Sequence, residues 1–170
     1  EYVGRSKDVA AQEAARIAGQ PTAELLDALS KVGDAQALYK TTQFGSCVYA
    51  NKPGDGSARE QAASCQKVIG GFANICKEYA TKRYRSNCIN WGMIPFTLGE
   101  GEEFDYDVAD YVFIPDIRRK IAAGDEAFAA KVITNDGVKD ITLYVKGLTD
   151  DEKKIILEGC LMNYYAAQNK

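Results

Sequence analysis

The sequence predicts an α/β domain with a three-layer β/β/α arrangement, in which a mainly parallel sheet is joined by a small antiparallel part. Segments that read alternately as strand and helix continue as far as Ile114, and such alternation is typical of a parallel sheet with helical cover. Beyond it, Asn135-Asp136-Gly137 separates two strand-like runs. Asp-Gly is a favoured hairpin turn, so the antiparallel strands are expected there.

Helix and strand signals alternate through the first half of the chain. An alanine-rich segment ends at Gly19, and Leu25, Leu29 and Val32 fall on one face of the next helix. A loop dense in turn-forming residues, 51–56, then separates a short strand from a further helix. The elements expected here are helices at 8–17, 21–32, 57–69 and 81–91, and strands at 47–50 and 72–76.

The second half of the chain ends in the clearest local signals. Its expected elements are a short apolar run at 93–96, an acidic loop at 98–107, a strand at 110–114, a short helix at 116–123 and hairpin strands at 130–134 and 138–146. Thr149-Asp150-Asp151-Glu152 is a capping box that opens a final helix to about Ala167. Because no repeat or linker interrupts the sequence, a single domain over residues 1–170 is expected.

Composition and charge exclude several classes of protein. With 46% hydrophobic and 26% charged residues, the chain has the make-up of a globular domain. The net charge of −3 and the pI near 5.1 argue against a general binder of nucleic acid or of a membrane surface. No apolar run approaches the roughly 18 residues of a membrane-spanning helix. We therefore expect neither a membrane nor a nucleic acid as partner.

Histidine is absent and the cysteines are scattered. The lack of histidine excludes Ser-His-Asp and Cys-His catalysis and His-ligated zinc. No pair of cysteines has C-x-x-C spacing, so no metal or cluster site is expected within this chain, and the cysteines are interpreted as small hydrophobic residues in a reducing cytoplasm. The cysteines are Cys47, Cys65, Cys76, Cys88 and Cys160. Because the chain begins at Glu1 rather than at a methionine, we expect it to be a piece of a longer polypeptide or a processed chain.

One segment has both the residues and the position of a binding site. Gly54-Asp55-Gly56-Ser57-Ala58-Arg59-Glu60 lies between a predicted strand and a predicted helix, where α/β sheets usually bind ligands. The start of a helix favours an anion through its free N–H groups and its dipole. Ser57 is predicted at the N-cap and Arg59, whose fork of donors can hold a carboxylate, in the first turn. The alternative is that Ser57 is only a cap and that Arg59 pairs with Glu60 or Asp55.

This segment resembles the G-E-G-S-S-R-E motif of the swivel domain in the aconitase superfamily, and it is similar to the motif in small subunits of isopropylmalate dehydratase. Downstream, the family's S-F-A…N…G-L-L-P-L segment is resembled by Tyr79-Ala80, Asn87 and Gly92-Met93-Ile94-Pro95-Phe96. The tail resembles the end of an aconitase at Leu143, Thr149, Glu152, Gly159 and Leu161-Met162-Asn163. The resemblance covers about residues 47–170.

The resemblance implies a swivel domain of an aconitase-like hydro-lyase, which reversibly dehydrates a small di- or tricarboxylic hydroxy acid. It implies that Ser57 is the catalytic base and that Arg59 binds a substrate carboxylate, with Gly56 and Ala58 also at the substrate. A [4Fe-4S] cluster is expected in the other domains of the parent protein, over which the swivel domain closes. Those cluster-bearing domains and the carboxylic acid are the expected partners, and the chain alone is expected to be inactive.

Two departures from the family motif open an alternative. The second serine of the motif is Ala58 here and the histidine after its R-E is Gln61, which puts citrate in doubt as the substrate. The alternative function is a catalytically inactive paralogue that binds a carboxylate. The RNA-binding role of some aconitase relatives is disfavoured by the acidic balance of the chain.

Four further cations are candidates for the site. Arg5 is a weak candidate for another substrate-binding arginine, since the amino-terminal third matches the family poorly. Lys82, Arg83 and Arg85 form a basic patch. This patch is interpreted as a solvated helix face, with the alternative that one of the three reaches the closed active site.

Overall fold

The computed structural model describes residues 2–169, and it begins with three helices. They are α1 (Tyr2–Ile17), α2 (Ala23–Ser30) and α3 (Ala35–Thr41). Helix α2 is capped by the side chain of Thr22 and buries Leu25 and Leu29, as the spacing predicts. Helix α3 was not predicted from the sequence. It is only 7 residues long and has no fully buried residue, although Ala35, Leu38 and Tyr39 are partly buried, and the side chain of Asp34 caps its start.

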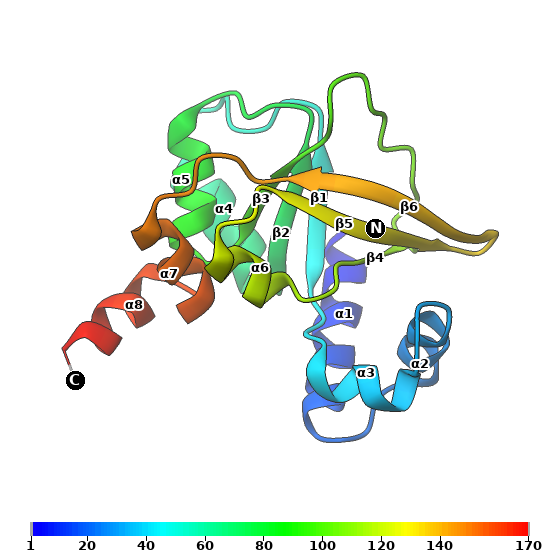
Figure 1. Ribbon diagram of the computed structural model, residues 1–170. Helices are drawn as coiled ribbons and strands as arrows, with labels where there is room; N and C mark the ends of the chain where they lie inside the picture. The colour runs from blue at the N-terminus through cyan, green and yellow to red at the C-terminus, as the bar shows by residue number, and fades with distance from the viewer. Residues whose placement is uncertain (1, 170) are drawn as a thin grey trace.

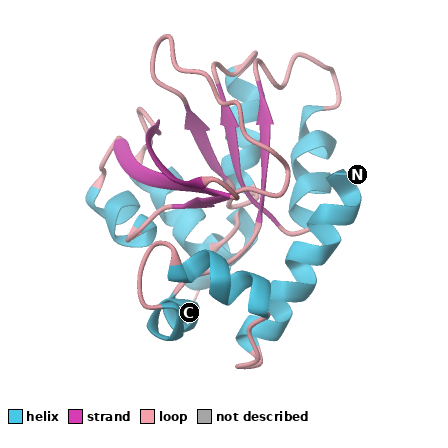
Figure 2. Ribbon diagram, turned by 90° about the vertical axis from the view of Figure 1, so that its right-hand side faces the viewer, coloured by secondary structure: helices cyan, strands magenta, loops and turns pink. Residues whose placement is uncertain are grey.

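The next five elements form a parallel sheet with two helices. They are β1 (Ser46–Ala50), α4 (Arg59–Val68), β2 (Gly71–Cys76), α5 (Lys82–Asn90) and β3 (Ile94–Thr97). Four of them were predicted, and the fifth, β3, lies in the short apolar run at 93–96, which was not assigned as a strand. Strand β2 pairs in parallel with both β1 and β3. Helices α4 and α5 pack on each other and on β2 and β3, respectively. The arrowheads of these three neighbouring strands point the same way in Figure 2, towards one group of loops.

The antiparallel part is larger than predicted. It consists of β4 (Tyr111–Phe113), β5 (Ala127–Thr134) and β6 (Gly137–Tyr144), with α6 (Ile117–Ala123) between β4 and β5. Strand β4 was expected to follow the strand–helix alternation of the parallel part, but it pairs antiparallel with β5. A parallel β4 would need a crossover from β3, and the segment between them contains no helix.

The two halves of the sheet meet at one residue pair. The strand order is β1-β2-β3-β6-β5-β4, and Thr97 of β3 faces Tyr144 of β6 at the junction. The strands therefore form one sheet rather than two separate β layers, although the β5–β6 hairpin extends well beyond the parallel strands (Figure 1). The α/β fold class is confirmed, and the single domain stays a prediction.

The expected final helix is divided in two. Helix α7 (Asp150–Glu158) opens with the predicted capping box of Thr149 and Glu152. It ends at Gly159, whose φ of +89° favours glycine, and α8 (Leu161–Gln168) follows. A Cβ atom at Gly92 would lie 1.9 Å from the carbonyl oxygen of Gly159, so the turn between α7 and α8 packs directly on the end of α5.

Two groups of buried side chains hold the fold together. The larger joins both halves of the sheet to α5, α6 and α7 and includes Phe96 and Phe128, whose rings pack edge to face. The smaller lies between α4 and α5 and contains Ala63, Tyr84, Cys88 and Met93. This second group supports the loop that precedes α4, which is where the sequence predicts the site.

Candidate functional site

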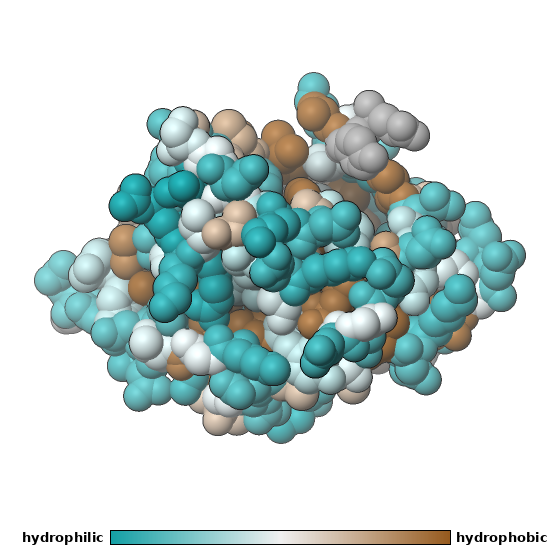
Figure 3. Space-filling model, turned by 90° about the horizontal axis from the view of Figure 1, so that it is seen from above, coloured by the Kyte–Doolittle hydropathy of each residue, from teal (hydrophilic) through white to brown (hydrophobic). Residues whose placement is uncertain are grey.

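The loop of residues 51–58 joins the end of β1 to the start of α4. It therefore lies at the carboxyl ends of the parallel strands, as predicted. This end of the molecule is seen from above in Figure 3, where hydrophilic residues cover most of the surface and a few hydrophobic ones show between them. Residues from the neighbouring loops after β2 and β3 come to the same end.

Backbone hydrogen bonds fix the loop to its neighbour. The carbonyl oxygen of Asn51 accepts from the N–H groups of Lys77 at 3.1 Å and Glu78 at 3.2 Å, and that of Pro53 accepts from Ala80 at 2.9 Å. All three donors belong to the segment between β2 and α5. The loop is thus held by backbone N–H groups of another segment of the chain.

Gly54 is the point of closest approach between the loop and α5. Its φ is +94°, a conformation that costs other residues free energy. A Cβ atom at Gly54 would lie 2.4 Å from the Cβ atom of Tyr84, which is itself only 2% exposed. The first glycine of the motif is therefore required by both its conformation and its space. Gly56 differs, since a Cβ atom there would meet nothing within 4 Å.

Arg59 is the first residue of α4, and one of its nitrogens is already engaged. Its Nε donates to the carbonyl oxygen of Gly54 at 3.1 Å. The hydroxyl of Thr81 donates to the same oxygen at 3.0 Å. Within residues 2–169 no ion pair of Arg59 occurs, so the expected alternative of a pair with Glu60 or Asp55 is wrong. Its two terminal nitrogens also have no hydrogen bond within the described part of the chain.

Ser57 is not the N-cap of α4. That position belongs to Ala58, with φ −90° and ψ 55°, and the helix begins with no side-chain cap. The prediction of a Ser57 cap was wrong because the first helical hydrogen bond runs from Ala62 to Ala58, one residue later than the sequence suggests. Gly56, Ser57 and Ala58 are all exposed. The Ser57 hydroxyl thus stands free of the helix, two residues before the Arg59 guanidinium.

Comparison with known proteins assigns the chain to a family. A model of the aconitase C-terminal domain matches residues 5–101, more than half of the chain. The chain belongs to the aconitase C-terminal domain family. The match begins well before residue 47, where the sequence resemblance was placed, and so includes the amino-terminal helices.

Individual relatives carry similar names. A protein of Emericella nidulans named as a mitochondrial aconitate hydratase is 28% identical over 112 residues, which cover 65% of this chain and 14% of that protein. Aconitate hydratase A of Bradyrhizobium diazoefficiens is 26% identical over 140 residues, which cover 77% of this chain and 15% of that protein. The chain thus spans about one seventh of the length of the aconitate hydratases it matches.

Arg85, one of the other candidate cations, and the nearby Trp91 are both engaged in contacts within the domain. The guanidinium of Arg85 donates to the carbonyl oxygen of Lys146 at 2.8 Å and lies 3.9 Å from Glu152. Trp91 packs against the buried group between α4 and α5 and donates its indole N–H to Glu60 at 2.9 Å. Lys82 and Arg83 remain exposed at the start of α5.

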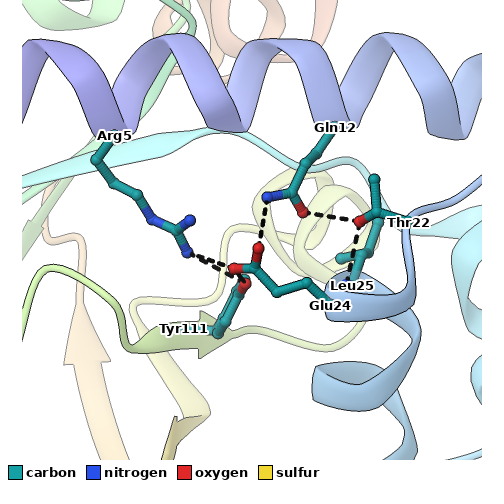
Figure 4. A network of polar contacts seen from close by, with 6 residues as sticks. All are labelled: Arg5, Gln12, Thr22, Glu24, Leu25 and Tyr111. Atoms are coloured by element: carbon teal, nitrogen blue, oxygen red, sulfur yellow. Dashed lines mark hydrogen bonds and ion pairs between the residues drawn. The ribbon is translucent and has the colours of Figure 1, made fainter.

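Arg5 belongs to a polar network that joins the amino-terminal helices to β4 (Figure 4). Its guanidinium donates to Glu24 at 3.0 Å and to the hydroxyl of Tyr111 at 3.1 Å. Tyr111 donates to Glu24, which also accepts from Gln12 at 3.1 Å. Burial alone would lower the pKa of Arg5, but the hydrogen bonds with Tyr111 and Glu24 outweigh it and raise that pKa. In this structure Arg5 ties the helices to the sheet.

The cysteines do not form a site for an iron–sulfur cluster. Cys76 and Cys88 are buried, and burial raises the pKa of each thiol to about 11, which opposes the thiolate form that binds metal. No group of three or more metal-ligating side chains comes together within residues 2–169. Residues 2–169 therefore do not supply the ligands of an iron–sulfur cluster.

Residues 55–58 of the loop are exposed, and Arg59 is partly buried. Two small hollows lie elsewhere. One of about 210 Å³ borders α6 and α7 beside Gly124 and Lys153, and one of about 160 Å³ borders α2 and β4 beside Lys31 and Tyr111. Neither includes a residue of the loop. No helix in the described part of the chain is long and apolar enough to cross a membrane.

Two residues near the candidate site were missed by the sequence analysis. Thr81 and Tyr84 fix the Gly54 turn from α5, and they lie far along the chain from the motif. A local signal exists only for Thr81, because threonine before a helix is a common N-cap, and its hydroxyl does accept from the N–H of Tyr84.

Proposed function

We propose that this chain is the swivel domain of an aconitase-like hydro-lyase that dehydrates a small di- or tricarboxylic hydroxy acid. The observation that carries the proposal is the environment of Arg59. This cation begins a helix at the carboxyl end of a parallel sheet, makes no ion pair within residues 2–169 and has no hydrogen bond there to its two terminal nitrogens. A bound carboxylate would supply the missing negative charge.

Arg59 binds one substrate carboxylate in this proposal. The helix dipole disfavours a cation in the first turn by a few tenths of a kcal/mol, so Arg59 is unfavourable there without an anion. The free N–H groups of the first turn of α4 and the guanidinium would hold the anion together. The exposed backbone at Gly56 and Ala58 lets a ligand come close to this helix start.

Ser57 acts as the base. A serine hydroxyl normally keeps its proton, and it becomes a base only where its alkoxide is favoured. The positive end of α4 and the Arg59 cation both favour that alkoxide. Its oxygen would then take the proton from the carbon next to the carboxylate that Arg59 holds. Because Ser57 is exposed and free of a capping role, it is available for this step.

The [4Fe-4S] cluster of the reaction belongs to the remaining domains of the parent protein, because residues 2–169 bring together no group of three metal-ligating side chains. The same domains would cover the open surface around Arg59, so the chain alone has no hydratase activity. The aconitase C-terminal family match and the short coverage of the aconitate hydratases support this division. The cytoplasmic location stays a prediction, and so does the absence of a nucleic-acid partner.

Ser57→Ala in the full-length protein tests the base. We expect turnover to fall by about 100-fold or more with little change in substrate affinity, because a base acts in the transition state. Ser86→Ala, at another exposed serine, is the matched control and should leave turnover unchanged. Since Ser57 caps no helix, its replacement should not lower the melting temperature, and an unchanged turnover would remove Ser57 from the mechanism.

Arg59→Lys tests the carboxylate site, since lysine keeps the charge but loses the planar fork. We expect it to weaken binding of di- and tricarboxylates by roughly 1.5–3 kcal/mol, as for a charge-assisted hydrogen bond. Arg119→Lys on α6 is the control. Titration calorimetry gives the affinities; equal binding by both variants and the wild type would contradict the proposal. Binding without turnover in the wild type would instead identify the inactive carboxylate-binding paralogue.

A further inference from the structure

We propose that Thr81 is a positioning residue for Arg59, and that it acts through the carbonyl oxygen of Gly54. This inference rests on the proposed function, because it concerns the carboxylate site. The Thr81 hydroxyl and the Arg59 Nε both donate to that one oxygen, at 3.0 Å and 3.1 Å. The carbonyl oxygen has two lone pairs, and the two donors occupy both.

The Gly54 carbonyl is held in place from α5. Thr81 is the N-cap of α5, where its hydroxyl oxygen accepts from the N–H of Tyr84 at 3.2 Å. Gly54 itself lies against the side chain of Tyr84. Tyr84 is 2% exposed, and its hydroxyl accepts from Asn74 at 3.0 Å and from Gln66 at 2.9 Å. The position of the oxygen is therefore set by the buried group between α4 and α5.

This arrangement decides which nitrogens of Arg59 meet the ligand. A guanidinium can hold a carboxylate through Nε and one terminal nitrogen, or through its two terminal nitrogens. Because Nε is engaged with Gly54, the two terminal nitrogens are left as the pair for the carboxylate. The hydrogen bond also limits rotation of the side chain, which reduces the entropy that is lost when the ligand binds.

A rotamer held only by packing would depend on contacts along the stem of Arg59. Here the fork is instead tied to the loop by a hydrogen bond at its base, and the loop is tied to α5 by Thr81. Loss of the Thr81 hydroxyl would leave the Gly54 carbonyl with one donor and less restricted. The loss of the Thr81 hydroxyl should therefore change the affinity for a ligand only through the position of Arg59.

The test is a double-mutant cycle on the full-length protein with Thr81→Val, Arg59→Met and the double variant. Titration calorimetry with malate, citrate and tricarballylate gives the dissociation constants. Thr81→Val should weaken binding of the best of these acids by about 3- to 10-fold, the effect of one hydrogen bond. In the Arg59→Met background the same change should have less than about a 2-fold effect. Thr81→Ser, which keeps the hydroxyl, should bind as the wild type does.

The outcomes separate this inference from the proposed function. If Arg59→Met binds all three acids as well as the wild type, or if the wild type binds none, the carboxylate site itself is wrong. If Arg59→Met weakens binding but Thr81→Val has no effect, or has the same effect in both backgrounds, Thr81 is a cap of α5 and does not position Arg59. Loss of the cap lowers stability in both backgrounds and therefore cancels in the cycle.

Discussion

Arg5 and Arg59 lie in two regions of the molecule that differ in how many hydrogen-bond acceptors surround the guanidinium. Arg5 is surrounded by side chains from α2 and β4 that accept its hydrogen bonds, and an aromatic ring lies 5.5 Å from its guanidinium carbon. Arg59 has one backbone carbonyl oxygen as its partner, and its terminal nitrogens are unpaired within residues 2–169. An arginine whose donors make hydrogen bonds within the domain stabilises the fold. An arginine whose donors have no partner in the domain is available to a ligand.

The two regions also differ in what keeps the arginine in place. The Arg5 network depends on side chains, and its members can be replaced one at a time. The Arg59 region depends on the backbone of the Gly54 turn, which fits against Tyr84 without space for another atom. Substitutions should therefore have their largest effect on stability at Gly54 and a moderate effect at Arg5.

Gly54→Ala should be the most destabilising of the changes considered. The alanine would have to adopt φ near +94° with its Cβ atom 2.4 Å from that of Tyr84. Backbone strain of about 1–3 kcal/mol and overpacking of about 1–3 kcal/mol add to an expected loss of roughly 2–6 kcal/mol. Urea unfolding of the variant measures it. Gly56→Ala in the same loop is the control, because its Cβ atom would meet nothing, and a similar loss there would mean that the loop is sensitive throughout.

The next comparison replaces each arginine with methionine. Arg5→Met removes two hydrogen bonds to Glu24 and Tyr111, and we expect it to cost about 1–2 kcal/mol of stability, since Glu24 is half exposed. Arg59→Met should change stability by less than about 0.5 kcal/mol, because it loses one hydrogen bond and relieves an unfavourable charge at the helix start. Thermal or urea unfolding of both variants checks the ranking, and the reverse order would mean that Arg59 is the structural residue.

Local sequence signals predicted the loop, and non-local contacts decided its details. The turn-forming residues of the motif and the strand before it placed the candidate site at the correct edge of the sheet. The cap was misplaced by one residue, because Ser57 and Ala58 both precede Arg59 and only the observed backbone angles separate them. Thr81 could not be connected with Gly54, since the pattern of neither segment encodes a contact between residues so far apart.

In the rest of the fold, too, local sequence signals located the elements and non-local contacts decided their arrangement. Strand β4 was located by its apolar residues, but its direction depends on pairing with β5, which no local pattern specifies. Helix α3 was missed because its 7 residues are too few to show a repeated apolar pattern, and none of them is fully buried. The last helix divides at Gly159, whose left-handed C-cap is a local glycine signal that was not used, and this turn packs against Gly92 from a different part of the chain.

The smallest expected effect is a dependence of the Arg5 region on acid. The hydrogen bond from Tyr111 lowers the pKa of Glu24, and the hydrogen bond from Arg5 lowers it further, against the opposing effect of burial. A carboxyl whose pKa is lower in the folded state stabilises the fold above its unfolded pKa of about 4.3. That stability is lost as the pH falls through the folded pKa. Because the Glu24 side chain is 52% exposed, the contribution should be under about 1 kcal/mol.

Glu24→Gln separates this contribution from the acid sensitivity of the rest of the chain. The wild type should be more stable than Glu24→Gln at pH 7, and the difference should shrink as the pH is lowered towards 3, because the protonated carboxyl can no longer attract Arg5. Tyr111→Phe removes the largest cause of the lowered pKa, so its own stability should depend less on pH in this range. Urea unfolding at several pH values measures all three proteins. If the difference in stability between wild type and Glu24→Gln stays constant with pH, Glu24 acts through its shape and hydrogen bonds. The ion pair with Arg5 would then not be what separates the Arg5 region from the Arg59 region.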